Sequence, residues 1–219
     1  MKLGGEMDSF FDSCVIINYL EFFLYKTELR KRCSDYINSN KDFLLCAYAL
    51  KEIQWFINKR AAQFYEVLKK IKNSSYKIGT DKEARMFNKE EIVYNEELFE
   101  ELKMFDVKIL SERFENEISV MRLNWRIFLK NRIKEFVVKE EEIDQSLINI
   151  LHEFLTKYAD CKILASALQA QRNRDFFLFV TLDKHFKENE YAFIEEEPRL
   201  RDYKFPKLKN LLHSNGRTY

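Results

Sequence analysis

The sequence predicts an α/β fold with a central, mostly parallel sheet flanked by helices, and with more helix than strand overall. Two short apolar runs, Ser9–Phe11 and Phe43–Ala47, are each followed by a helical pattern. A third run, Phe176–Val180, is apolar without alternation, as in a strand buried on both faces of a parallel sheet. No glycine or proline occurs in residues 6–78 or 80–197, which favours long helices joined by short polar turns.

Apolar residues at helical spacing define the remaining elements. They predict helices at Ser13 to about Leu24, Thr27 to about Ile37, about Ala49 to Ile71, Ile143 to Leu155, and around Asp160. A last strand, at the edge of the sheet, is expected at Tyr191–Ile194.

The chain of 219 residues is long enough for one domain with a sizeable core. We predict a single domain over residues 1–219 with a helical insertion at about 80–145. The charges of this insertion are segregated, with a net −6 from Asp81 to Glu117 and a net +5 from Arg122 to Lys139. Basic residues recur there every four positions and would form a stripe on a helix, at Arg122, Arg126, Lys130 and Lys134. The stripe is either a solvated face or a track for a nucleic-acid backbone.

Several classes of protein are not expected. The longest apolar run, Phe43–Leu50, is too short to span a bilayer, and acids precede the first apolar run where a signal peptide would be basic. The sequence contains no phosphate-binding glycine motif. The cysteines are irregularly spaced, so we expect buried thiols in a reducing cytoplasm and no zinc site, at Cys14, Cys33, Cys46 and Cys161.

Three acids lie where strands are expected to end. Asp12 and Asp183 follow apolar strands, and Glu52 lies in the expected first turn of the long helix after the Phe43–Ala47 strand. Open α/β sheets place their sites at these strand ends. For Asp12 the alternative is a plain helix cap, and for Glu52 it is an acid that complements the helix dipole.

A fourth acid lies on an otherwise apolar helix face. Asp160 shares its face with Ile163, Leu164, Ala167 and Leu168, at helical spacing. Burying a carboxylate without a cation or a donor is costly, so the sequence favours a functional role for Asp160.

The order of these motifs resembles the PIN-domain nuclease family. The pair Asp12-Ser13 after a strand, the helix Asp160-Cys161-Lys162-Ile163-Leu164-Ala165-Ser166-Ala167 and the strand end Thr181-Leu182-Asp183 carry the likeness. The match covers roughly the first and last thirds of the chain. It implies a PIN-like three-layer fold and a metal-dependent endoribonuclease that hydrolyses single-stranded RNA. Such an enzyme would be a toxin of a toxin–antitoxin pair, a defence nuclease or an RNA-processing nuclease.

The four acids also suit the chemistry that this resemblance implies. Clustered carboxylates repel and need protons or cations, and oxygen-only ligation suits one or two Mg²⁺ or Mn²⁺ ions. We expect Asp12 and Asp183 as direct ligands and Asp160 as a ligand or water holder. Glu52 would complete the metal site and orient a water molecule. Ser13 and Thr181 are candidate donors that support the ligands.

The substrate is expected to contact basic residues and one histidine: Arg122, Arg126, Lys130, Lys184 and His185. For His185, a plain surface or helix-start role is the alternative. DNA stays open as a substrate, because metal-assisted hydrolysis does not require a 2′-hydroxyl. Expected partners are RNA, an antitoxin or another protein, and a second copy in a homodimer. The alternative functions are a catalytically inactive PIN-like module that binds RNA or protein, and a helical adaptor.

Overall fold

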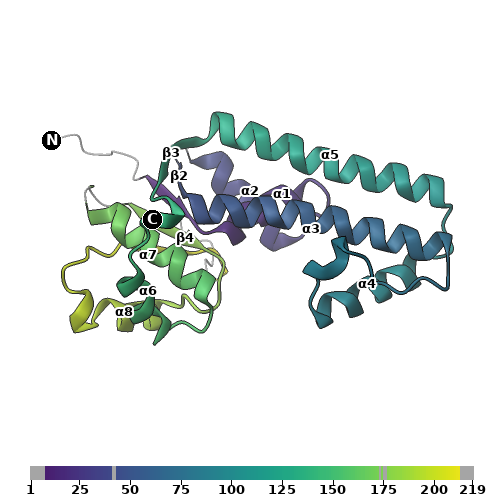
Figure 1. Cartoon of the computed structure of the whole chain (residues 1–219). Helices are drawn as coiled ribbons and strands as arrows, with labels where there is room; N and C mark the ends of the chain where they lie inside the picture. The colour runs from purple at the N-terminus through teal and green to yellow at the C-terminus, as the bar shows by residue number, and fades with distance from the viewer. Residues whose placement is uncertain (1–7, 41–42, 173, 175–176, 213–219) are drawn as a thin grey trace. The chain divides into compact units, whose positions relative to one another are not determined.

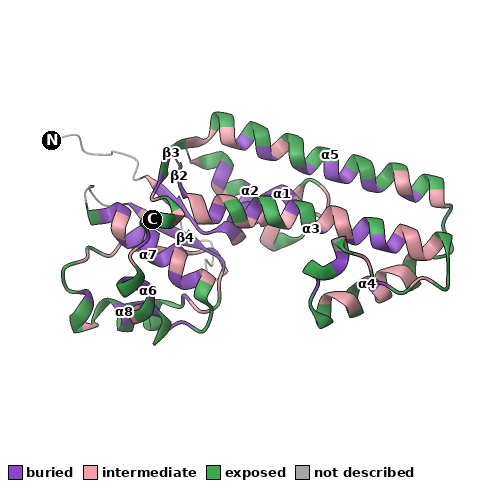
Figure 2. Cartoon of the chain, in the orientation of Figure 1, coloured by how far each residue is buried: buried purple, intermediate pink, exposed green. Residues whose placement is uncertain are grey.

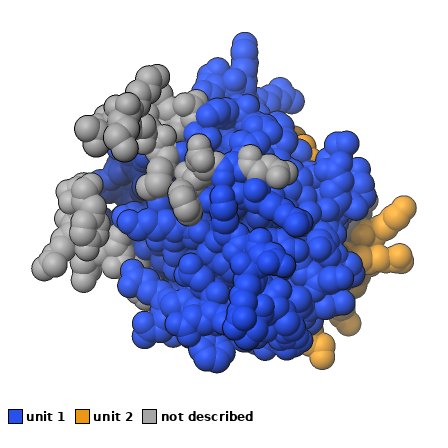
Figure 3. Space-filling view, turned by 90° about the vertical axis from the view of Figure 1, so that its left-hand side faces the viewer, with its two compact units in different colours: residues 1–53, 126–219 blue, residues 54–125 orange. Residues whose placement is uncertain are grey.

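The computed structural model describes residues 8–40, 43–172, 174 and 177–212. The described residues form two compact units (Figure 3). Unit 1 is drawn from residues 1–53 and 126–219, and unit 2 from residues 54–125. The second unit therefore begins and ends earlier than the helical insertion predicted at about 80–145.

Unit 1 is built on a parallel sheet, as predicted. Its strands are β1 (Ser9–Phe11), β2 (Phe43–Cys46), β3 (Ile133–Val137), β4 (Leu178–Thr181) and β5 (Lys207–Asn210), in the order β3-β2-β1-β4-β5. Every strand pairing among the described residues is parallel. In the central strand Phe10 pairs with Leu44 of β2 and with Phe179 of β4.

The central strands form the core of unit 1 because both of their faces are covered (Figure 2). Every residue of β1 and β2 is buried. Aromatic side chains in and next to the central strands contact one another: the ring centroids of Phe11 and Phe43 lie 4.6 Å apart, edge to face, and those of Phe10 and Phe177 lie 5.8 Å apart, stacked. Such pairs add stability beyond the area that they bury.

The helices that the structure describes are labelled in Figure 1. Their bounds are α1 (Ser13–Phe22), α2 (Glu28–Ser39), α3 (Ala47–Lys72), α4 (Lys89–Leu102), α5 (Val107–Asn131), α6 (Gln145–His152), α7 (Tyr158–Arg172) and α8 (Glu188–Glu195). For this strand order, the usual right-handed crossover would put the connection from β1 to β2 on one face of the sheet and that from β3 to β4 on the other. Among the helices, α1 packs on α2, and α6 packs on α7, which contacts β2.

Two predicted elements are wrong. The expected edge strand Tyr191–Ile194 lies within helix α8, where Tyr191 and Ile194 are buried at the i, i+3 spacing of a helix. Part of the stretch predicted as helical, Ile133–Val137, is instead the edge strand β3. Helix α5 ends at Asn131, so Lys134 lies on β3 and not on the basic helix face, and it pairs with Asp8 at 3.0 Å.

Unit 2 has a helical core of its own. The rings of Phe64 and Phe114 are stacked with centroids 4.0 Å apart. Glu66 is fully buried, and its carboxylate accepts hydrogen bonds of 2.8 Å from the Tyr76 hydroxyl and of 3.0 Å from the Gly79 amide. No helix in the described part of the chain combines the length and the hydropathy that crossing a bilayer requires.

Candidate active site

The predicted acids meet where the order of strands reverses. From β1 the chain first adds β2 and β3 on one side, and later adds β4 and β5 on the other. The ends of β1 and β4 therefore flank a topological switch point, where connections leave in opposite directions and a crevice opens. Asp12 directly follows β1, and Asp183 lies two residues past the end of β4.

Asp12 is buried, and its carboxylate both caps helix α1 and accepts hydrogen bonds within the candidate site. Its Oδ1 accepts a hydrogen bond of 3.4 Å from the Cys14 amide as the N-cap of α1. Its Oδ2 accepts hydrogen bonds of 2.6 Å from the Thr181 hydroxyl and 3.0 Å from the Cys14 thiol. Burial raises the pKa of Asp12, although the donors from Cys14 and Thr181 counteract part of the shift. The cap and the site roles predicted for Asp12 are thus compatible.

Thr181 joins the two strand-end acids. Its hydroxyl donates to Asp12 and accepts a hydrogen bond of 2.9 Å from the Asp183 amide. The Asp183 carboxylate in turn accepts a hydrogen bond of 2.8 Å from the His185 amide. Each carboxylate is therefore oriented by its own donors, as metal-binding carboxylates usually are.

Glu52 reaches the same place from α3. The sequence predicts Glu52 in the first turn of this helix, but α3 begins at Ala47, directly after β2, so Glu52 lies in its second turn. Its Oε2 accepts a hydrogen bond of 2.8 Å from the Ser13 hydroxyl. Burial raises the pKa of Glu52, and the charge of Asp12 adds to that shift. The position is too far from the helix end for a simple dipole role.

Among the four acids, Asp160 is the one with a buried oxygen that lacks a hydrogen-bond partner. It lies in the first turn of α7, is only 9% exposed, and its buried Oδ2 has no hydrogen-bond partner in the structure. Burial, together with the charges of Asp183 and Asp12, raises the pKa of Asp160 to about 7. An unpartnered buried carboxylate oxygen is costly and points to a ligand that completes it.

Two residues of the site were not predicted from the sequence. Lys157 places Nζ 3.3 Å from Asp183 Oδ2. Burial lowers the pKa of Lys157, but Asp160, Asp183 and Asp12 outweigh it and hold the value above the ordinary one. Cys14 is the other, a thiol that donates to Asp12 and whose pKa burial raises well above its usual range. For Lys157, the only feature of the sequence that indicates a place in the site is its position three residues before Asp160.

The donor chemistry of this cluster, oxygen ligands with one unpartnered oxygen, fits a hard divalent cation. As the side chains stand, however, no group of three or more His, Cys, Asp or Glu residues in the described part of the chain is arranged to hold a metal ion. Lys157 supplies the positive charge in this arrangement. A divalent cation would have to replace the Lys157 ammonium and draw the carboxylates together.

The residues expected to contact the substrate do not all belong to the unit that contains the four acids. Arg122, Arg126 and Lys130 lie on α5, but Arg122 belongs to unit 2, whereas the four acids belong to unit 1. Lys184 and His185 form the turn that comes after Asp183.

A second group of cations lies beside the acids. The Lys162 ammonium lies 4.6 Å from the ring centroid of Tyr48 and pairs with Glu140 at 3.1 Å. Lys51 pairs with the same Glu140 at 3.0 Å. Burial and the charges of Glu52 and Glu140 raise the pKa of Tyr48 to about 12. No sequence pattern indicates this group, because its members come from α3, α7 and the segment between them.

No family model, no curated protein and no solved structure matches this chain.

Proposed function

We propose that the protein is a metal-dependent endoribonuclease that hydrolyses phosphodiester bonds of single-stranded RNA. One observation carries the proposal: Asp12, Glu52, Asp160 and Asp183 interact electrostatically at the switch point of the sheet, and the buried Oδ2 of Asp160 lacks a partner. Sites of this kind perturb the pKa of their carboxyl groups by burial and like charge.

Asp12, Asp160 and Asp183 would hold one or two Mg²⁺ or Mn²⁺ ions, with Glu52 bound directly or through water. When bound, such an ion activates a water molecule and neutralises charge on the phosphate. The Ser13 hydroxyl fixes the Glu52 carboxylate, so Glu52 can orient the attacking water. Thr181 and Cys14 fix Asp12 in the same way.

In this proposal the Lys157 side chain moves away from the acids when a cation binds. Its side chain is 58% exposed, whereas that of Asp183 is only 13% exposed, and the two charged atoms lie 3.3 Å apart. Because the ammonium is largely solvated, it can leave the acids when a cation takes over the charge of Asp183. It would then lie at the rim of the site, where a lysine binds a phosphate as a point charge.

RNA as the substrate rests on the resemblance to PIN-domain nucleases and on the cations around the acids. The charges of Lys157 and Lys162 act on the acidic cluster and would offset its repulsion of a phosphate backbone. The exposed ring of Tyr158 lies beside Lys162, with the ammonium 5.4 Å from its centroid. Aromatic rings next to cations are what unpaired nucleotides stack on.

The second candidate function is a PIN-like module that binds RNA or protein without cleaving it. The position of Lys157 favours this candidate, because a lysine that stays among the acids neutralises them without a metal. The two functions predict different results when a divalent cation is added.

A cleavage assay distinguishes them. Purified protein is incubated with fluorescent single-stranded RNA in Mn²⁺, with and without chelator, beside Asp12→Asn and the matched control Asp35→Asn, whose acid is exposed on α2. The proposal predicts cleavage by the wild type and the control, and none by Asp12→Asn or with chelator. Binding of RNA without cleavage under all conditions would support the second candidate. Equal cleavage by Asp12→Asn would exclude Asp12 from the chemistry.

A further inference from the structure

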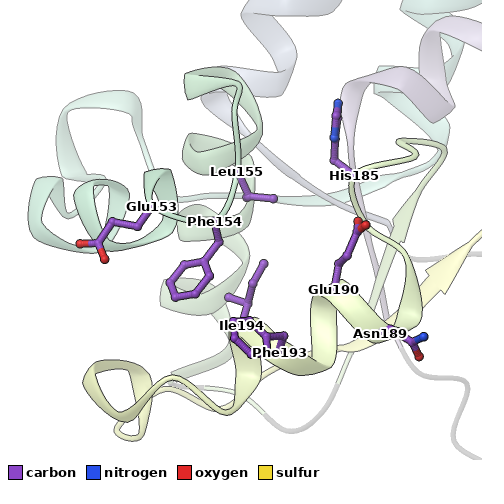
Figure 4. A pocket seen from close by; sticks show the side chains of 8 residues that line it. All are labelled: Glu153, Phe154, Leu155, His185, Asn189, Glu190, Phe193 and Ile194. Atoms are coloured by element: carbon purple, nitrogen blue, oxygen red, sulfur yellow. The ribbon is translucent and has the colours of Figure 1, made fainter.

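A hollow of about 550 Å³ opens beside the candidate active site in unit 1 (Figure 4). The segment just before Lys157 forms one wall, and helix α8 with the turn after Asp183 forms the other. Its volume lies within the range of about 300–1,000 Å³ that is usual for small-molecule sites. None of its lining residues belongs to the acidic cluster.

The hollow has an apolar side and a polar side. Phe154, Phe193 and Ile194 gather on one side, and the carboxyl group of Glu190 extends on the other side towards His185 (Figure 4). Phe193 is 65% exposed, and its ring meets that of Phe154 edge to face, with centroids 6.0 Å apart. An exposed aromatic surface opposite a carboxylate suits a flat, neutral ligand that carries hydrogen-bond donors.

Both walls of the hollow are close in the chain to residues of the proposed active site, where the RNA would bind. The amide of His185 donates to the Asp183 carboxylate at 2.8 Å, so this wall of the hollow is attached directly to a proposed metal ligand. Leu155, on the opposite wall, lies two residues before Lys157. A nucleotide next to the phosphate held at the acids would therefore reach the hollow with its base.

The carboxylate selects among the bases. Glu190 accepts hydrogen bonds only, and its exposed ion pair with Lys187 is long, at 3.7 Å, so the carboxylate is readily available to a ligand. Guanine is the base that presents two adjacent donors, N1–H and the 2-amino group, on its Watson–Crick edge. Adenine, cytosine and uracil each place an acceptor beside their donor, and an acceptor would repel the carboxylate.

We propose that this hollow binds an unpaired guanine next to the scissile phosphate, stacked on Phe193 and hydrogen-bonded by Glu190. The inference rests on the proposed ribonuclease function and adds a base preference to it. Glu190 and Phe193 are specificity-determining residues in this proposal, and they take no part in the hydrolysis.

The test uses two readouts on the chain of 219 residues. The probes are fluorescent uridine oligonucleotides with one central guanosine, inosine or adenosine. Binding is measured by anisotropy with Ca²⁺ in place of Mn²⁺, so that a divalent cation can hold the phosphate at the acids, and the ratio of affinities cancels the contribution of the shared backbone. Cleavage positions are mapped in Mn²⁺. The variants are Glu190→Gln and Phe193→Ala, and the matched control is Glu188→Gln, an exposed acid of the same helix that does not line the hollow.

We expect the wild type and Glu188→Gln to bind the guanosine probe about tenfold more tightly than the adenosine probe, as a good bidentate contact to a base provides. Inosine, which lacks the 2-amino group, should fall between them. Glu190→Gln should lose the preference, and Phe193→Ala should weaken binding of all three probes.

Equal binding of the three probes by the wild type, or an unchanged preference in Glu190→Gln, would overturn the inference. The two readouts separate its failure from that of the proposed function. A guanosine preference in binding without any cleavage would support the guanine site and contradict the nuclease activity. Cleavage without a base preference in either readout would support the nuclease activity and contradict the guanine site.

Discussion

At the scale of single residues, the feature that matters most is how unevenly the four acids are satisfied. Asp12 accepts hydrogen bonds from Thr181 and Cys14, whereas Asp160 Oδ2 accepts none. Burial opposes ionisation of both, and at Asp160 burial together with the charges of Asp183 and Asp12 raises the pKa to about 7. A cation bound at Asp160 would favour its ionised form at neutral pH.

The first prediction concerns the pH dependence of stability without metal. The pKa of Asp160 is about 7 in the folded chain and about 3.9 when exposed, so the folded state binds the extra proton between these values. Stability should fall as the pH rises from about 4 to 7 and then level off. Asp12 and Glu52, whose pKa values are also raised, contribute to the same fall, so Asp160→Asn should make it smaller without abolishing it. The substitution should raise the free energy of unfolding at pH 8 by about 1–2 kcal/mol, allowing for solvent screening. Urea denaturation in chelator from pH 4 to pH 8 measures it, and a pH-independent difference between the two proteins would contradict it.

The second prediction concerns Lys157, whose charge competes with a metal and would then serve the substrate. Lys157→Gln should tighten Mn²⁺ binding about fivefold, because about 1 kcal/mol of charge repulsion is removed. The same substitution should lower kcat/KM for RNA. The exposed Lys31→Gln on α2 is the matched control and should leave both values unchanged. Weaker metal binding by Lys157→Gln, measured by calorimetry, would show that the lysine supports the site in another way.

The sequence was informative about residues whose pattern is local. The acid–hydroxyl pair Asp12-Ser13 and the apolar spacing around Asp160 are visible in short segments. The contact of Lys157 with Asp183 is not, because it joins residues 26 positions apart through an exposed side chain with no periodic pattern. Nothing in the sequence indicates that Oδ2 of Asp160 lacks a partner.

At the scale of elements, helix α7 determines whether Asp160 reaches the other acids. Ala165 and Ala167 are fully buried on α7, and Ser166 donates to the Lys162 carbonyl at 2.8 Å. Small side chains let this helix lie close to the sheet, where it contacts β2. The distance of the helix from the sheet therefore sets the position of Asp160.

The third prediction tests that role of α7. Ala165→Leu overfills a packed position and should destabilise the protein by about 1–3 kcal/mol. It should also weaken Mn²⁺ binding, because α7 must move away from the sheet and carry Asp160 with it. Ala192→Leu on the exposed face of α8 is the matched control and should change neither value. Loss of stability with unchanged metal affinity would show that α7 does not position the site.

The elements also show where sequence patterns fail. The buried strands β1 and β2 were predictable because both faces are apolar. The edge strand β3 was not, because three of its five residues are exposed and its Lys134 continued the four-residue spacing of the basic helix. The pattern of Tyr191–Ile194 predicts a strand although the segment is helical, because four residues are too few to separate a period of 2 from one of 3.6.

At the scale of the whole molecule, the candidate site is confined to one of the two units. All four acids belong to unit 1, although α3 and α5 each continue from one unit into the other. The sheet order that creates the switch point is likewise a property of unit 1. The metal chemistry should therefore depend on unit 1 alone.

The fourth prediction concerns this division into units. Phe114→Ala removes a buried ring that is stacked on Phe64 in unit 2 and should cost about 3–5 kcal/mol there. Amide hydrogen exchange should increase in residues 54–125, while β1 and β4 keep their protection and Mn²⁺ affinity changes less than about twofold. Loss of protection in β1 and β4 as well would show that the units unfold together.

Binding of Mn²⁺ by the wild-type protein at pH 8, followed by electron paramagnetic resonance, is the decisive measurement for the metal site. We expect one or two bound ions per chain, and weaker binding by Asp12→Asn, Asp160→Asn and Asp183→Asn but not by Asp35→Asn. A wild type that binds no Mn²⁺, or binds it equally in all variants, would contradict the claim that these carboxylates form a metal site.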